Sequence, residues 1–364
     1  MNMTALSRFR LPIISLSILV LVAWVIDFWP LPIRPLWTRF PQLKKIRSLT
    51  KPLDIFALSQ FKSSHLPLYQ LFILPQDIHT ATLRLDQNDY SVTISSEIPG
   101  QFILNSPNPI NGHTKMVIAP IEATAFLTEA TSQWYAKKMG SMSRTGWFVR
   151  LSVNGQSPGL FYVEESLSKD TLERNRRNSD SDIYVTTEIV TKNPPSPIFM
   201  WEKISSNPID PINFAPLQQL FDVAALTDEQ LKNRGLRQLI DIDNFNRWNV
   251  HRQLFSTKSH SITTAPPLYF NRESGKFEFI PNSLLDTYPA SSPVNQIIEY
   301  LNALPDIQTA QQQIQQSIEN STMHTEAIAA YDQISNSINS ALAADQHKPY
   351  STLFGNLRIK EMSP

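Results

Sequence analysis

The stretch from 147 to 165, WFVRLSVNGQSPGLFYVEE, constrains the fold more than any other part of the chain. Its first arm alternates apolar and polar side chains, which is typical of a half-buried β-strand. Asn154-Gly155 follows and tolerates the positive φ angles of a tight hairpin turn. The second arm, 159–163, is apolar on both faces, as in a strand inside a sheet. The stretch therefore predicts a β-hairpin built into a larger sheet.

The hairpin ends in two carboxylates, Glu164 and Glu165, directly before a helical segment. A carboxylate at this place either orients a lysine or a metal ion, or offsets the exposed N–H groups of the next helix. That helix, SKDTLERNRRNSDSD, contains the basic side chains of Arg174, Arg176 and Arg177. They either contact phosphate groups or mark a solvated helix end. Both pairs of alternatives stay open at this point.

Composition limits the chemistry that the chain can use. The 32 basic and 32 acidic residues cancel, so no bulk charge attracts nucleic acid, and we expect no nucleic-acid partner. Cysteine is absent, which removes disulfides, thiol nucleophiles and thiolate metal ligands. The 9 glycines form neither GxGxxG nor GxxxxGK, so the glycine-built phosphate loops are missing.

The segment 11–29, LPIISLSILVLVAWVIDFW, is apolar enough and long enough to cross a bilayer core of roughly 30 Å. No small-x-small cleavage site follows it, which favours a single-pass signal anchor over a cleaved signal peptide. Basic residues after the span outnumber those before it, which favours a cytoplasmic C-terminal side, although long domains translocate regardless of such charges. We expect a tail at 1–10, a transmembrane anchor at 11–30, a juxtamembrane linker at 31–67, one folded domain at 68–345 and a C-terminal tail at 346–364.

Within the expected domain, strand patterns come first and helical patterns last. The alternation predicts short strands that form a small antiparallel sheet, and Pro120 is expected to open a helix that ends at Gly140. The inner face of a helix opened by Asp241 or Asp243 is assigned to Phe245, Trp248, Asn249 and Leu254. Two apolar stripes near the C-terminus predict helices that pack on the core or bind a partner helix. The predicted strands are 68–74, 81–85, 90–94, 102–104 and 116–118, the helices are 121–140, 227–239 and 243–255, a hairpin covers 268–281, and 193–217 is expected to be a proline-rich loop or crossover.

These motifs, in this order, resemble the CotH family of atypical protein kinases related to the spore coat protein H. In the hairpin, Asn154, Gly155, Gly159 and Glu165 match the family pattern, with Phe161 in place of a tyrosine. DIDNFNRW at 241–248 and LYFNRESGKFEFIP at 268–281 are similar to the family's later motifs. The resemblance implies an α+β, atypical kinase-like fold with an antiparallel sheet lobe and a helical C-terminal lobe, here preceded by one transmembrane helix. For an active member it also implies ATP with Mg²⁺ or Mn²⁺.

The chain departs from the family pattern at the positions that carry the chemistry. Where metal-binding aspartates are expected, Asp286 is the one carboxylate, Asn282 offers a neutral oxygen, and a serine stands in place of the first aspartate. Where the catalytic aspartate is expected, STKSHSITTAPP places Ser259 or His260, and the histidine is either a proton acceptor or a surface side chain. The strand expected to carry the phosphate lysine, 101–104, has none, and Lys115 lies before a different strand.

Two functions follow from the resemblance and its departures. The first is a membrane-anchored, degenerate pseudokinase that acts as a binding or scaffolding module at the cell envelope, with a possible protein partner. The alternative is an active kinase that transfers phosphate from a nucleotide to a protein, with Asp286 and Asn282 on the metal, Glu165 as the orienting carboxylate and His260 as the base. The family's habit places the domain outside the cytoplasm, whereas the flanking charges favour the opposite side.

Overall fold

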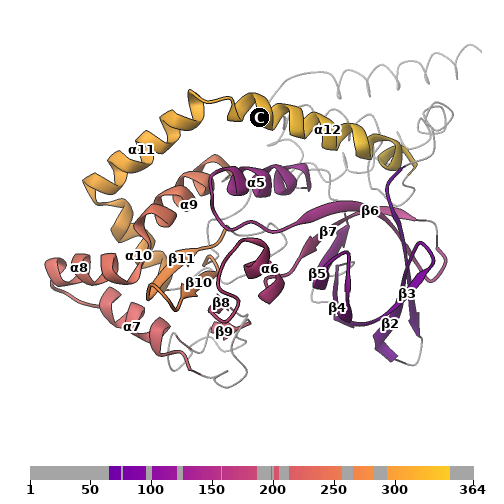
Figure 1. Cartoon of the computed structure of the whole chain (residues 1–364), viewed down its shortest axis with the longest axis horizontal. Helices are drawn as coiled ribbons and strands as arrows, with labels where there is room; N and C mark the ends of the chain where they lie inside the picture. The colour runs from indigo at the N-terminus through magenta and orange to yellow at the C-terminus, as the bar shows by residue number, and fades with distance from the viewer. Residues whose placement is uncertain are drawn as a thin grey trace, which may run out of the picture.

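The computed structural model describes residues 65–74, 77–95, 101–120, 126–156, 158–186, 198, 201–204, 213–255, 265–281 and 293–344. The chain has an α+β fold, as the sequence predicts. A β-barrel formed by the first half of the described chain lies on one side, and a small sheet surrounded by helices lies on the other (Figure 1). The predicted anchor at 11–30 lies outside the described residues. Among the helices described, none is both long and apolar enough to cross a membrane.

Seven strands close into the barrel in the order β1-β2-β3-β4-β5-β7-β6. All neighbours are antiparallel except β1 and β6, which pair in parallel, with Tyr69 opposite Leu151. Fully buried apolar side chains such as Leu71, Leu104 and Ile118 fill the interior. The strands are β1 (Leu68–Leu74), β2 (Asp77–Leu85), β3 (Asn88–Ser95), β4 (Phe102–Ile110), β5 (His113–Pro120), β6 (Gly146–Val153) and β7 (Gly159–Glu165).

A closed barrel replaces the small sheet that the sequence predicts. Closure leaves neither β1 nor β6 as an open edge, and an open edge is a template for aggregation. β4 and β5 are longer than predicted because they meet at the tight turn Asn111-Gly112, where φ is 52° and 83°. Pro120 pairs with Phe161 at the end of β5, so it is a strand residue and does not open a helix. The helix predicted over 121–140 is present at Phe126–Lys138, and 121–125 lie outside the described residues.

The second half of the described chain combines a four-stranded sheet with most of the helices. The sheet order is β11-β10-β8-β9, and aromatic side chains such as Tyr184, Phe277 and Phe279 form its core. The strands are β8 (Asp182–Thr186), β9 (Trp201–Lys203), β10 (Leu268–Asn271) and β11 (Lys276–Phe279). The helices of the described chain are α5 (Phe126–Lys138), α6 (Lys169–Arg174), α7 (Ala215–Ala224), α8 (Glu229–Leu239), α9 (Ile242–Phe255), α10 (Pro293–Asn302), α11 (Pro305–Glu319) and α12 (Met323–Ala344).

The start of α9 is fixed against β11. The Asp241 carboxylate accepts a hydrogen bond from the Asn244 backbone N–H at 2.9 Å, as an N-cap side chain does. The Asn244 side-chain oxygen in turn accepts from the Phe279 N–H at 2.6 Å. The two later motifs, DIDNF and FEFIP, therefore meet in space. One expectation for this helix is wrong, because Leu254 is 46% exposed instead of facing the core.

The two C-terminal helices pack on the rest of the protein. Tyr331, Ile338 and Leu342 of α12 are buried against Leu127 of α5 and Phe148 of β6. Figure 1 shows α11 and α12 running along one side of the molecule, with α12 over α5 and the barrel. Of the two uses that the sequence allows for these stripes, the structure has core packing.

Candidate functional site

Glu165 lies at the end of β7, where the barrel faces the rest of the molecule. Met116 of β5 is opposite Glu165 in the ladder, and the Glu165 side chain is 1% exposed. Alternation along β7 places Glu165 on the same face as Val163, a residue of the barrel core. Its Oε1 accepts a hydrogen bond from the Thr145 N–H at 2.9 Å. A buried carboxylate of this kind needs a positive partner, because burial of an unpaired charge is costly.

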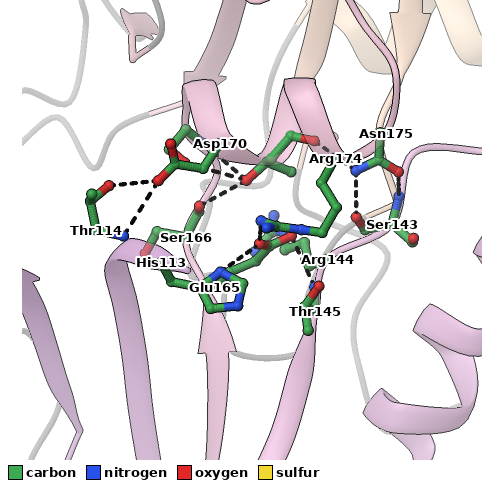
Figure 2. Close-up of polar contacts among 12 residues, drawn as sticks. His113, Thr114, Ser143, Arg144, Thr145, Glu165, Ser166, Asp170, Arg174 and Asn175 are labelled. Carbon is green, nitrogen blue, oxygen red and sulfur yellow. Dashed lines mark hydrogen bonds and ion pairs between the residues drawn. The ribbon is translucent and has the colours of Figure 1, made fainter. Parts of the chain in front are cut away.

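The Glu165 carboxylate has two nitrogen-bearing neighbours. Nη2 of Arg174, at the end of α6, forms an ion pair with its Oε2, and His113 Nδ1 lies 3.0 Å from the same oxygen. Figure 2 shows both side chains directed at Glu165 from opposite sides. Burial lowers the pKa of His113, and the nearby Arg174 charge lowers it further. At neutral pH the imidazole is therefore uncharged, and Arg174 supplies the positive charge.

Lys115 does not take part in this ion pair. It is the neighbour of Met116 on β5, so strand alternation directs its side chain to the other face of the barrel wall. No residue of 101–104 is a lysine either, and Phe102, Ile103 and Leu104 lie in β4. Glu165 thus orients a cation, as one of the sequence alternatives states, but the cation is an arginine from the following helix.

The capping alternative for the two glutamates is wrong. Ser168 occupies the N-cap of α6, and the acidic residue of its first turn is Asp170. Glu164 belongs to the opposite face of β7, where its Oε2 lies 3.4 Å from the Arg144 guanidinium with both side chains buried. The two carboxylates therefore have separate partners on the two faces of one strand.

Three side chains fix α6 to its surroundings. Asp170 accepts a hydrogen bond from the Thr114 hydroxyl at 2.8 Å, at the start of β5. Asn175 exchanges two hydrogen bonds of 2.9 Å with the backbone of Ser143, ahead of β6. Arg177 donates to Glu278 of β11 at 3.0 and 2.8 Å. Arg174 is thereby held in a frame that connects the barrel to the second sheet.

The basic run after the hairpin has a definite structure. The N–H groups of Arg176 and Arg177 bond to the carbonyls of Glu173 and Leu172, which is the Schellman ending of a helix. Arg176 occupies the left-handed position of that ending, with φ of 57°. Two of the three arginines, Arg174 and Arg177, are engaged with carboxylates, so the run is more than a solvated helix end.

The end of the barrel near His113 is closed by aromatic and polar groups. The His113 ring stacks on Trp147 with a centroid separation of 5.1 Å. The Tyr69 hydroxyl accepts hydrogen bonds from Trp147 Nε1 at 3.1 Å and from Asn111 Nδ2 at 3.0 Å. Glu165 and His113 are therefore held in place by packing, and solvent reaches the cluster from the side of Arg174.

A second buried cluster, which sequence reasoning missed, lies in the four-stranded sheet. Asp182 of β8 pairs with Lys203 of β9 at 3.2 Å and with Arg272, beyond β10, at 2.9 Å. Asp182 and Lys203 are almost fully buried, and Arg272 is the exposed member. The proline-rich context of Lys203 predicts a loop, so the sequence carries no signal for this pairing.

The remaining predicted site residues, His260, Asn282 and Asp286, lie outside the described residues. The described residues break off at Pro281, two residues after β11 ends, and resume at Pro293. Among the residues described, no group of three His, Cys, Asp or Glu side chains is placed to hold a metal ion. The metal ligands expected from the sequence therefore stay predictions.

The comparison with protein families agrees with this order of motifs. The family described as CotH kinase protein matches residues 100–286, which include β4 to β11 and reach Asp286. Strands β1 to β3 and helices α10 to α12 lie beyond the matched range. No curated protein matches the chain. Since the match covers more than half of the 364 residues, the chain belongs to the CotH kinase protein family.

Proposed function

We propose that this protein is a degenerate kinase of the CotH family that acts as a binding or scaffolding module instead of transferring phosphate. The observation that carries the proposal is the pairing of Glu165. Protein kinases require a lysine–glutamate ion pair at the nucleotide phosphates. Here the buried carboxylate is paired with Arg174 and His113, and Lys115 belongs to the other face of the strand.

The sequence supports the same proposal at two further places. A phosphoryl-transfer enzyme needs a residue that positions the attacking hydroxyl, and the segment 256–267 contains no Asp or Glu. Mg²⁺ needs carboxylates beside the phosphate oxygens, and Asp286 is the single carboxylate in 281–286. The lysine, the aspartate and a metal carboxylate are each replaced by a residue of different chemistry.

The proposal extends to where the module works. An apolar segment at 11–30 would anchor it in a membrane, and the CotH resemblance favours the outer side, at the cell envelope. Protease added to intact cells tests this placement. Digestion of the 68–345 domain from outside supports it, and full protection until the cells are broken contradicts it.

Phosphate transfer by the full chain in detergent tests the main proposal. The chain is incubated with radiolabelled ATP and Mg²⁺ or Mn²⁺, with itself and a generic protein substrate as acceptors. An active protein kinase in the same buffer is the positive control. We expect no label above that of a heat-denatured sample.

An Asp286→Ala variant shows whether any phosphate transfer that is detected depends on the expected metal site. Transfer that occurs in the wild-type protein and disappears in this variant would show a working metal site and overturn the proposal. The alternative, an active kinase with Asp286 and Asn282 on the metal and His260 as the base, would then be the correct reading.

A further inference from the structure

We propose that Arg174, held by Glu165, binds the phosphate groups of a nucleotide, in the role for which kinases use a strand lysine. The inference rests on the proposed function, since it names the ligand of the binding module. Arg174 belongs to α6, which follows Glu165 in the sequence. The lysine expected from the family resemblance would precede Glu165.

The geometry of the ion pair leaves Arg174 able to bind a second anion. A guanidinium has five N–H donors in a planar fork, which matches a phosphate as well as a carboxylate. Among the described residues, the pair to Glu165 through Nη2 is the single ion pair or hydrogen bond of the Arg174 side chain. Its Nε and Nη1 donors are thus left for a ligand.

Burial separates the roles of the three members of the cluster. The Glu165 side chain is 1% exposed, that of His113 is 6% exposed, and that of Arg174 is 35% exposed. A solute therefore meets Arg174 first, while the carboxylate behind it fixes the guanidinium. This division leaves an oriented and accessible guanidinium, which can form charge-assisted hydrogen bonds with a phosphate.

Neighbouring charges decide what kind of anion can bind. Asp170 lies on the same helix and is engaged by Thr114, and Glu173 forms an exposed pair with Lys169. One guanidinium beside these carboxylates favours a ligand with several negative charges over a single carboxylate. The polyphosphate of a nucleotide meets that requirement, and the depleted metal segment leaves the guanidinium as its main counter-charge.

Nucleotide binding to the full chain tests this role. ATP affinity is measured in the presence of EDTA, so that the guanidinium contact is read without metal. We expect Arg174→Ala to weaken binding by roughly 10- to 100-fold, as the loss of one hydrogen-bonded charge does. Arg84→Ala is the matched control, because Arg84 is a carboxylate-paired arginine on the remote β2 hairpin, and we expect less than about a twofold change.

Footprinting of the wild-type protein keeps the test valid if Arg174→Ala fails to fold. Phenylglyoxal modifies accessible arginines, and mass spectrometry reads each site. We expect saturating ATP to slow modification of Arg174 several-fold, and adenosine, which lacks phosphate, to leave it unchanged. Arg84 should react equally under all conditions.

Specific results would overturn the inference. They are a wild-type chain that does not bind ATP in EDTA, an Arg174 that stays reactive at saturating ATP, or equal protection by adenosine. Failure here is separable from failure of the proposed function. Phosphate transfer together with ATP protection of Arg174 refutes the degenerate kinase alone, whereas neither transfer nor binding refutes the Arg174 inference alone.

Discussion

The ion pair between Glu165 and Arg174 is predicted to have a larger coupling energy than an exposed pair in the same protein. A double-mutant cycle with Glu165→Gln and Arg174→Gln isolates the coupling between the two side chains. Glutamine keeps an oxygen for the Thr145 N–H, which Glu165 Oε1 now accepts at 2.9 Å. Glu165→Gln therefore removes the charge and preserves the side-chain shape, and Arg174→Gln removes the guanidinium.

The expected magnitude follows from burial. Two unit charges about 4 Å apart interact by about 4 kcal/mol at an effective dielectric constant of about 20. The Arg174 side chain is 35% exposed, so solvent screens part of this, and we expect a coupling of about 2 kcal/mol. The pair of Arg84 and Asp89, with side chains 46% and 48% exposed, should give a clearly smaller coupling in the same cycle, because solvent screens both charges.

Urea unfolding at pH 8 is the assay, at low salt and again at about 1 M NaCl. At this pH His113 is neutral in the native protein, because burial and, after it, the Arg174 charge lower its pKa. High salt, with a Debye length of about 3 Å, should weaken the Arg84 pair more than the Glu165 pair. A Glu165–Arg174 coupling no larger than that of the exposed pair would refute the electrostatic reasoning.

Three further predictions use the same unfolding measurement. Gly146→Ala should destabilise by roughly 1–3 kcal/mol, because the new Cβ would lie 1.9 Å from the buried Tyr162 hydroxyl, and Tyr162→Phe should recover part of the loss. Arg176→Gly should stabilise by about 0.5–1 kcal/mol, because Arg176 sits at a φ of 57°. Burial lowers the pKa of His251 to about 4, so the unfolded chain takes up its proton first as pH falls below about 6.5. Stability should drop by about 2 kcal/mol between pH 8 and pH 5, and His251→Gln should remove that dependence. An unchanged pH dependence in that variant, or a neutral effect of Gly146→Ala, would contradict the respective argument.

Local patterns predicted the turn of the 147–165 hairpin and the starts of α8 and α9 correctly. Asn154 and Gly155 adopt the positive φ angles that their types indicate, 49° and 77°. Asp228 accepts hydrogen bonds from the N–H groups of Gln230 and Leu231, as an N-cap does. These features depend on a few neighbouring residues, and the sequence carries the whole physical cause.

Barrel closure could not be predicted in the same way. The parallel pairing of β1 with β6 joins Tyr69 to Leu151 across most of the barrel's sequence, and no turn fixes its register. Strands β8 and β9 were not predicted, for a related reason. Lys203, for example, lies in a three-residue strand beside a proline-rich segment. Their stability comes from pairing with distant strands, which strand patterns alone do not report.

The site was half predictable. Glu165 could be predicted as a site residue because it ends a buried strand. Its partner could not, because Arg174 belongs to a basic run that is typical of a solvated helix end. A signal was present: Ser168 is a good N-cap residue, so α6 could be started there and Arg174 placed in its last turn, close to the strand end. His113 carried no signal, since its contact with Glu165 requires β5 to pair with β7, a later strand that no turn connects to it.

The ending of α6 explains why neighbouring arginines serve different sheets. A helix that continued past Arg174 would place Arg177 on the same side as Arg174, because residues three apart share a face. The left-handed Arg176 reverses the chain instead, so Arg177 pairs with Glu278 of the second sheet while Arg174 pairs with Glu165 of the barrel. Burial raises the pKa of Glu278, and the Arg177 charge opposes that rise. Arg177 therefore stabilises the charged form of a buried carboxylate, as Arg174 does for Glu165. The short helix therefore determines where the cation of the site stands relative to both sheets, and the proposed phosphate contact depends on this turn as much as on Glu165.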